Sequence, residues 1–256
     1  MKIAILGCGG LGAALARGLL GKAELTIVDR HAEKLAPFAS QARVQQELGD
    51  AVHGAEVVLC CVKPGGTRAL VASLEGALGR DALLVSCAAG IEVAGLRASG
   101  PAARAMPNIG AGKGASTTAL FLGARCVRPR DLTRLSEVFG AVGAVRELPE
   151  ESLMHMATAI AASGPAFLLQ AVEALVEGGV AHGLPRPDAL AFAAGALRAA
   201  AALMEEGVEP AALCALVTSP KGTTAAGLAC LEAAGVRAAF AEAVRAAVLR
   251  SRELSG

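Results

Sequence analysis

Three glycines near the N-terminus have the spacing of a phosphate-binding loop. Gly7, Gly9 and Gly12 form a G-x-G-x-x-G pattern directly after an apolar run at residues 3–6, which is typical of a strand buried on both faces. The first glycine permits a tight turn, the second lets a pyrophosphate approach the backbone, and the third lets helix and strand pack closely. The sequence therefore predicts a dinucleotide held at the N-terminus of the next helix.

An acidic residue follows where the adenosine ribose of such a dinucleotide should bind. Asp29 ends a second apolar run and lies 22 residues after Gly7. Its carboxylate can accept hydrogen bonds from the ribose hydroxyls of NADH and would repel the 2′-phosphate of NADPH, whereas Arg30 would attract that phosphate. We therefore expect NADH or NADPH as the cofactor, with a weak preference for NADH.

A second candidate site is the segment 218–224, with the sequence TSPKGTT. Ser219 before a proline is typical of a helix N-cap and first turn, and Gly222 gives the backbone freedom. Free N–H groups at that helix start can hold a small carboxylate, and the hydroxyls of Thr223 and Thr224 can bond a reacting nitrogen or oxygen. On these residues alone, a well-capped surface helix is the better interpretation.

The elements that must position these residues alternate between strand and helix in the first half of the chain. Buried-strand patterns lie at residues 3–6, 24–29, 42–45, 56–62, 82–87, 103–106, 117–122 and 144–148. Helical patterns lie at residues 13–20, 31–40, 67–78 and 129–142. This alternation predicts an α/β fold with a Rossmann-like, parallel, doubly wound sheet, whose ligands bind beyond the carboxyl ends of the strands.

Cofactor contacts are therefore expected in the glycine-rich loop and just after the strands. The candidate cofactor-binding residues are Gly7, Cys8, Gly9, Gly10, Leu11, Gly12, Asp29, Arg30, Val62, Lys63, Pro64, Ala88, Ala89, Gly90 and Asn108. The small residues at 88–90 would let a flat ring approach the backbone. Lys63 is equally well interpreted as an ordinary solvated lysine.

From residue 150 onward, alanine-rich helical patterns replace the strand patterns. The run 151–180 is apolar on nearly all sides and is interrupted by Ser163-Gly164-Pro165; further helices are expected at residues 187–206, 211–217, 225–233 and 236–254. A helix that is apolar all round must be buried. We therefore predict a dinucleotide-binding domain at residues 1–149 and a helical domain at residues 150–256 that binds substrate and dimerises. Packing against the first domain is the alternative.

Composition narrows the remaining classes of function. The formal net charge is +1, from 24 basic and 23 acidic residues without a basic block, so a nucleic-acid partner is not expected. No apolar run reaches the roughly 18–20 residues of a membrane span, and the chain begins directly with a strand, so we expect a cytoplasmic protein without a membrane partner or signal peptide. The seven cysteines form no C-x-x-C pair and the four histidines are scattered, so reduced thiols and no metal site are expected.

Six matches, one of them made of three short segments, carry a family resemblance. They are GCGGLGAALARGL at 7–19, VKP at 62–64, SCAAG at 86–90, RAMPN at 104–108, SGPA at 163–166 followed by GGV at 178–180 and GLPR at 183–186, and TSPKGTT at 218–224. In all six the chain resembles the pyrroline-5-carboxylate reductases, over nearly its whole length. Six matches in the same order are far more specific than any one of them.

The resemblance implies the last step of proline biosynthesis, in which hydride passes from a reduced nicotinamide to the C=N carbon of 1-pyrroline-5-carboxylate. Carried over residue by residue, Ser219 and the backbone of Gly222 and Thr223 would hold the substrate carboxylate. Thr224, the candidate catalytic residue, would bond the ring nitrogen. Such a reaction needs orientation rather than a nucleophile or a metal. The family also implies a homodimer or a higher homo-oligomer, up to a decamer.

Four residues depart from the family pattern. Lys221 replaces a usual glycine, Ala161 and Ala162 replace Ser-Gly, and Phe167 replaces a tyrosine. A lysine at 221 is strained if the backbone needs a positive φ there, and otherwise adds positive charge near the carboxylate. Two other functions stay open: a hydroxyacid or imine reductase of the same two-domain plan, which should carry a lysine on the helix 151–180 where this chain has none, and a non-catalytic nucleotide sensor.

Overall fold

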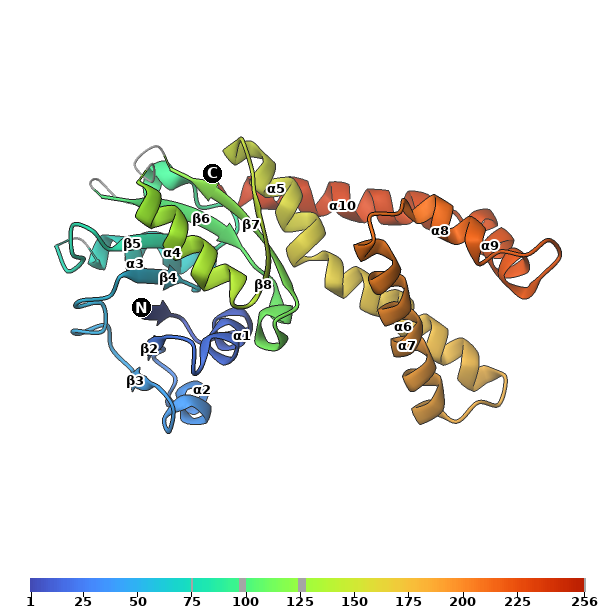
Figure 1. Ribbon diagram of the computed structural model, residues 1–256, viewed down its shortest axis with the longest axis horizontal. Helices are drawn as coiled ribbons and strands as arrows, with labels where there is room; N and C mark the ends of the chain where they lie inside the picture. Colours follow the sequence, from blue (N-terminus) through green and yellow to red (C-terminus); the bar gives the residue numbers. More distant parts are fainter. Residues whose placement is uncertain (75, 97–99, 124–127, 256) are drawn as a thin grey trace. The chain divides into compact units, whose positions relative to one another are not determined.

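The computed structural model describes residues 1–74, 76–96, 100–123 and 128–255. The chain forms two compact units (Figure 1). The first unit comprises Met1–Ser163 and Ala246–Gly256, and the second comprises Gly164–Arg245. The chain therefore leaves the first unit and returns to it for its last residues. The domain boundary expected between residues 149 and 150 stays a prediction.

An eight-stranded sheet forms the centre of the first unit, in the order β3-β2-β1-β4-β5-β6-β7-β8. The strands are β1 (Lys2–Leu6), β2 (Glu24–Val28), β3 (Arg43–Gln45), β4 (Val57–Cys60), β5 (Leu83–Ser86), β6 (Ala102–Met106), β7 (Ser116–Leu122) and β8 (Gly143–Glu147). All eight expected strands are present, and the order of the first six is that of a Rossmann fold. The predicted Rossmann-like, doubly wound sheet is thereby confirmed.

The central strands are continuous apolar runs because helices or loops cover both of their faces. Along β1, Ile5 faces one core, which is completed by helices α1 (Gly10–Leu19) and α4 (Pro129–Gly140). Leu6 faces the other core, which is completed by α3 (Pro64–Ser73). Both side chains are almost fully buried. Burial of such a side chain stabilises the fold by about 1.5–3 kcal/mol.

Short helical turns complete the first unit. They are α2 (Ala32–Leu35), α5 (Met154–Ala157), the 3₁₀ turns Ala36–Phe38, Val93–Gly95, Ile109–Lys113 and Glu151–Leu153, and a π-helical turn at Thr158–Ala162. The expected helix 31–40 is thus one α-helical turn followed by a 3₁₀ turn. Helix α3 begins at Pro64, before the expected start at residue 67, because proline fits the first turn of a helix.

One strand direction differs from the expected all-parallel sheet. β7 runs antiparallel to β6, with Arg104 opposite Phe121, whereas the other strand pairs of the described residues are parallel. A parallel pair needs a crossover of a dozen or more residues, usually a helix. Only a short connection with a 3₁₀ turn links β6 to β7, so the chain reverses direction there.

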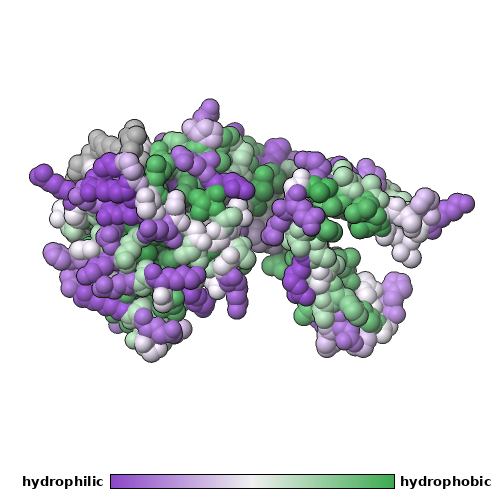
Figure 2. Space-filling model, in the orientation of Figure 1, coloured by the Kyte–Doolittle hydropathy of each residue, from purple (hydrophilic) through white to green (hydrophobic). Residues whose placement is uncertain are grey.

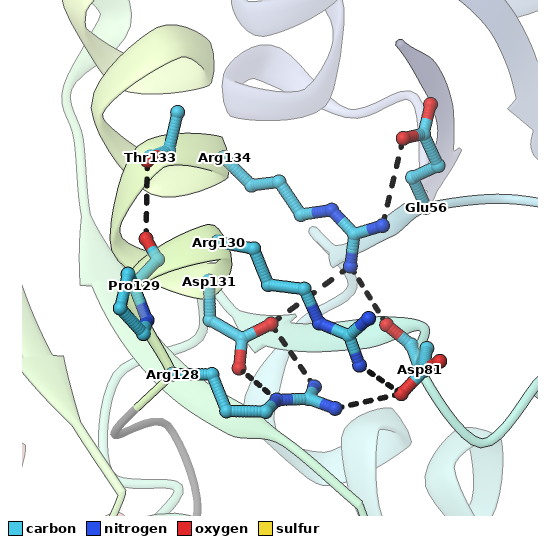
Figure 3. Close-up of polar contacts among 8 residues, drawn as sticks. All are labelled: Glu56, Asp81, Arg128, Pro129, Arg130, Asp131, Thr133 and Arg134. Carbon is cyan, nitrogen blue, oxygen red and sulfur yellow. Dashed lines mark hydrogen bonds and ion pairs between the residues drawn. The ribbon is translucent and has the colours of Figure 1, made fainter.

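A network of arginines and carboxylates holds the start of α4 beside the amino ends of β4 and β5 (Figure 3). Asp131 is fully buried and receives two hydrogen bonds from Arg128, at 2.7 and 3.1 Å. Arg128 also donates to Asp81 at 2.6 Å, and Arg134 donates to the carbonyl oxygen of Asp81 at 2.8 Å and to Glu56 at 3.5 Å. This network lies at the edge of the sheet opposite the glycine-rich loop, so its role is structural.

The second unit is helical and has little core of its own. Its helices are α6 (Gly164–Ala181), α7 (Arg186–Glu205), α8 (Pro210–Leu216), α9 (Thr223–Ala233) and most of α10 (Val236–Glu253). The buried residues of its core cluster are Val176, Ala189 and Ala193. Large apolar side chains lie at its surface, where Figure 2 shows broad hydrophobic areas; they include Leu168, Leu169, Leu175, Leu190, Phe192, Leu216 and Leu231. These helices therefore need a further apolar partner surface.

Length and composition alone would also allow some of these helices to cross a membrane. Two stretches of the described chain pass that test, Glu151–Ala181 with a mean hydropathy of 1.6 and Arg186–Glu205 with 1.2. The bent pair Thr223–Ala233 and Val236–Glu253 would pass as a third. The expected absence of a membrane partner therefore stays a prediction.

Candidate active site

The glycine-rich loop lies between β1 and α1, at the carboxyl end of β1. Gly7 has a φ of +99°, which only glycine adopts readily, and its N–H donates to the carbonyl oxygen of Val28 at 2.8 Å. A Cβ on Gly12 would lie 1.9 Å from the carbonyl oxygen of Gly7, so the first turn of α1 needs glycine at this position to pack so closely. At Gly9 a Cβ would meet no atom of the described residues within 4 Å, so that side of the loop is open.

The N-terminus of α1 faces this open side with unbonded N–H groups. The first backbone bond of the helix runs from Ala13 to Gly9, at 2.9 Å. The N–H groups of Gly10, Leu11 and Gly12 therefore have no acceptor inside the helix. Together with the positive end of the helix dipole they suit a pyrophosphate. The loop residues thus fit the expected dinucleotide.

Asp29, directly after β2, is hydrogen bonded to this loop. One carboxylate oxygen accepts the N–H of Cys8 at 2.8 Å, the other accepts the N–H of His31 at 3.0 Å, and Lys34 lies 3.6 Å away. Burial disfavours the charged form, but the hydrogen bonds from His31 and Cys8 and the Lys34 ammonium outweigh it and lower the pKa of Asp29. The side chain is only 10% exposed. Its charge is therefore largely engaged by the protein, and Arg30 next to it is exposed.

Three cysteines, one in the loop and two in neighbouring segments, pack as small apolar side chains. Cys8 and Cys87 belong to the core under α1, and Cys61 packs against it. Burial raises the pKa of Cys8, and a hydrogen bond to Cys87 together with burial raises the pKa of Cys61. The thiols of Cys8 and Cys61 are therefore poor nucleophiles at neutral pH. Cys126 lies outside the described residues.

The residues after β4 lie next to the loop. Val62 packs against Gly7, since a Cβ at Gly7 would lie 2.9 Å from the side chain of Val62. Lys63 is the exposed N-cap of α3 and Pro64 is its first residue. The carbonyl oxygen of Lys63 accepts the N–H of Gly66 at 2.9 Å. The N-terminus of a second helix is thus placed beside the glycine-rich loop.

The residues after β5 are more enclosed than expected. Ala88 is buried and its N–H donates to the Ser86 hydroxyl at 3.3 Å, and Ala89 packs beside β6 and α5. Gly90 has a φ of +74°, and a Cβ there would lie 2.6 Å from the backbone of Leu254. This glycine lets the end of α10 pack against the sheet. Its predicted contact with the cofactor stays a prediction.

Asn108 follows β6 at the same edge of the sheet. Its side-chain oxygen accepts the N–H of Gly110 at 2.8 Å, and its side-chain nitrogen donates to the carbonyl oxygen of Ala161 at 3.0 Å. Its backbone N–H donates to the buried Ser116 hydroxyl at 3.1 Å. Two further residues that depart from the family pattern, Ala161 and Ala162, lie in the π-helical turn that Asn108 contacts.

A buried charged cluster that the sequence did not predict surrounds Arg104 on β6. The Arg104 guanidinium is 1% exposed and donates to Glu151 at 3.1 Å, while Glu151 also accepts the N–H of Val93 at 2.8 Å. His155 and Ser251 are hydrogen bonded at 3.0 Å. Burial, and then the positive charge of Arg104, lower the pKa of His155. In the sequence, the feature that could have indicated this buried charge is the single arginine in the otherwise apolar strand β6.

The segment 218–224 forms the turn before α9 in the second unit. The N–H of Gly222 donates to the carbonyl oxygen of Ser219 at 3.0 Å, and a Cβ on Gly222 would lie 2.3 Å from the Ser219 hydroxyl. Lys221 has a φ of +62°, the left-handed conformation in which a lysine is strained. Thr223 and Thr224 are exposed and open the helix. The chain thus brings all four predicted substrate-binding residues together, and Phe167 lies partly buried on α6.

The two halves of the chain match two family profiles. Residues 151–254 match the profile described as pyrroline-5-carboxylate reductase dimerisation, and residues 2–90 match the profile described as NADP oxidoreductase, coenzyme F420-dependent. The first match covers the apolar helices of the second unit and the turns that precede them.

Whole-chain relatives agree with the first profile. The pyrroline-5-carboxylate reductase of Synechocystis sp. is 42% identical over 84% of this chain and 80% of its own length. That of Methanosarcina acetivorans is 34% identical over 99% of this chain and 97% of its own length. The solved structure of the Streptococcus pyogenes 1-pyrroline-5-carboxylate reductase has a TM-score of 0.87 at 28% identity and covers 99% of this chain and 98% of its own. With a Rossmann-like sheet, a phosphate-binding loop and relatives of this identity over its full length, the chain belongs to the pyrroline-5-carboxylate reductase family.

Proposed function

We propose that this chain reduces 1-pyrroline-5-carboxylate to L-proline, with NADH or NADPH as the hydride donor. One observation carries the proposal: a dinucleotide loop and the TSPKGTT turn occur in one chain that is 34% identical over 97% of the length of a named pyrroline-5-carboxylate reductase. A hydroxyacid dehydrogenase is not favoured, because the stretch 151–180 contains no lysine to serve as its catalytic residue.

The chain's own residues then have the following roles. The N–H groups at the start of α1 bind the pyrophosphate, and the residues after β4, β5 and β6 line the nicotinamide. The bound nicotinamide supplies the hydride. The Ser219 hydroxyl and the N–H groups at the start of α9 bind the substrate carboxylate, and the Thr224 hydroxyl bonds the ring nitrogen. The N–H of Gly222 is already bonded to Ser219, so Thr223 is the better backbone donor.

Assembly and location follow from the same proposal. The domain of residues 1–149 binds the dinucleotide, and the helical domain of residues 150–256 binds the small substrate and joins the chain into a homodimer or a decamer built from five such dimers. The exposed apolar side chains of α6 to α9 supply the contact surface. We propose a cytoplasmic enzyme without nucleic-acid or membrane partners, in which the apolar helices are buried by a second copy of the chain.

The deciding experiment follows the absorbance of NADH and NADPH with and without 1-pyrroline-5-carboxylate, and identifies proline as the product. We expect oxidation that depends on this substrate and a large loss of kcat in Thr224→Ala with unchanged nucleotide binding. Loss of one hydrogen bond costs on the order of 1 kcal/mol, and more if its partner stays buried. Thr133→Ala, at an exposed threonine of α4 whose hydroxyl donates to the carbonyl oxygen of Pro129, is the matched control. Nucleotide oxidation that ignores the substrate would contradict the proposal.

A further inference from the structure

The π-helical turn Thr158–Ala162 lies directly before α6. Its closing bond runs from the N–H of Ser163 to the carbonyl oxygen of Thr158 at 3.0 Å, five residues apart. The Thr158 hydroxyl donates back to the carbonyl oxygen of Met154 at 2.6 Å. A π-helical turn is rare and is found frequently at functional sites. This turn therefore needs a physical explanation.

Pro165 changes the hydrogen bonding of this turn. In an α-helix the carbonyl oxygen of residue 161 would accept the N–H of residue 165. Proline has no N–H, so Ala161 lacks its α-helical donor. The side-chain nitrogen of Asn108 donates to that carbonyl oxygen instead, at 3.0 Å. A residue 53 positions earlier in the chain thus supplies a donor that the helix itself cannot.

The two contacts of the Asn108 side chain fix its orientation. Its oxygen must face Gly110, whose N–H is a donor, and its nitrogen must face Ala161, whose carbonyl is an acceptor. Both ends of the amide are therefore engaged by the protein. Asn108 also stands directly after Met106-Pro107 at the carboxyl end of β6, the edge at which doubly wound sheets bind their ligands.

We infer that Asn108 is a positioning residue, which ties the π-helical turn to the edge of the sheet where the nicotinamide lies. Its donor nitrogen serves Ala161 and not the dinucleotide. This inference rests on the proposed function for its effect on catalysis, because hydride transfer depends on a closely held geometry. Loss of the tie should therefore lower kcat while leaving nucleotide affinity nearly unchanged.

The experiment compares Asn108→Asp with Asn108→Ala. The aspartate keeps the size of the side chain and the acceptor for Gly110, but loses the donor for Ala161 at neutral pH. We expect both variants to lower kcat at least about fivefold, with the dissociation constant for NADPH, measured by fluorescence titration, within about twofold of wild type. Ser73→Ala, which removes an exposed side-chain bond to the Leu70 carbonyl oxygen, is the control and should change neither.

A pH series separates positioning from capping. The carboxyl introduced by Asn108→Asp regains an O–H donor when it is protonated, so its kcat relative to wild type should rise as pH falls toward about 4, the ordinary pKa of an aspartate. The Asn108→Ala variant should show no such rise. If the kcat of Asn108→Asp equals that of wild type at every pH, Asn108 acts only by accepting the N–H of Gly110, and the inference is wrong. A weaker NADPH affinity with unchanged kcat would identify Asn108 as a cofactor ligand and would also overturn it.

Hydrogen exchange gives a readout that does not depend on turnover. In Asn108→Ala the amides of residues 158–163 should exchange faster, while those of α4 should not change. If the wild-type protein does not reduce 1-pyrroline-5-carboxylate, the proposed function fails, but the exchange data still decide whether Asn108 holds the turn. Unchanged exchange in residues 158–163 would show that the bond from Asn108 to Ala161 does not stabilise the turn, and the inference would be wrong.

Discussion

The carboxylate of Asp29 accepts the backbone N–H of Cys8 at 2.8 Å, across 21 residues of sequence. This bond joins the end of β2 to the loop that faces the pyrophosphate. The other oxygen of Asp29 accepts the N–H of His31, and Lys34 offsets its charge. Asp29 therefore supports the phosphate-binding loop, and its charge faces the ribose less freely than its position in the sequence indicates.

Asp29→Asn should weaken the binding of both NADH and NADPH, because the loop loses a charge-assisted hydrogen bond worth about 1.5–3 kcal/mol. Dissociation constants of both nucleotides, measured by fluorescence, check this. Asp50→Asn, at an exposed pair with Arg43, is the matched control. If only NADPH binding improves, by tenfold or more, Asp29 discriminates between the cofactors through its charge and the support role is wrong.

Acid should destabilise the first unit through His155. Its pKa lies below the ordinary value near 6.5 in the folded protein, so the unfolded chain binds the proton first. The free energy of unfolding is therefore highest above pH 6.5. It falls as the pH drops from the pKa of His155 in the unfolded chain to its lower pKa in the folded protein. Melting temperatures from pH 8 to pH 5 should fall less in His155→Gln than in wild type. His53→Gln, at an exposed histidine, should follow wild type; if both variants do, His155 is not the titrating group.

Lys221→Gly should stabilise the protein by about 0.5–1 kcal/mol, since glycine adopts a φ of +62° without strain. It should also raise the KM for 1-pyrroline-5-carboxylate about two- to fivefold, because an ammonium near the substrate carboxylate is lost. Thermal melting and steady-state kinetics measure the two effects. Lys221→Gln keeps the strain and removes the charge, so it should raise KM without stabilising. An unchanged KM in both variants would show that the strained lysine does not serve the substrate.

Asp131→Asn should destabilise the first unit by about 2–4 kcal/mol, because Arg128 loses a buried, doubly hydrogen-bonded partner. Urea unfolding measures this loss. Glu242→Gln breaks an exposed pair with Arg245 and should have no measurable effect. A similarly small effect of Asp131→Asn would mean that the network in Figure 3 contributes little to stability.

The helical unit should hold the chain in a dimer or a larger oligomer. Phe192 is 69% exposed in the single chain, so Phe192→Glu should shift sedimentation toward the monomer. Leu132→Glu, at an exposed position on α4 of the first unit, is the control. A stable, soluble wild-type monomer at micromolar concentration would contradict the prediction.

Most strands and helices of the first unit can be predicted from the sequence, because buried parallel strands are continuous apolar runs separated by helical patterns. Helix α3 begins earlier than its apolar periodicity indicates, because Pro64 favours the first turn of a helix. The antiparallel direction of β7 could not be predicted, because the spacing of apolar residues carries no information on strand direction.

The parts of the site made by local sequence were also predictable, since Gly7 and Gly12 have the steric roles that their spacing indicates. Contacts between distant residues were not. The bond from Asn108 to Ala161 and the approach of Leu254 to Gly90 depend on how separate elements pack, and neither produces a pattern along the chain.

The return of the chain's last residues to the first unit makes the helical unit an insertion within it. The outgoing and returning segments are joined to each other by the bond between His155 and Ser251, and Leu254 packs on Gly90 beyond it. If the chain were cleaved once within the helical unit, the two fragments should stay together, because each keeps a segment that belongs to the first unit. Removal of residues 251–255, by contrast, would uncover Gly90 and remove the bond that His155 makes to the returning segment.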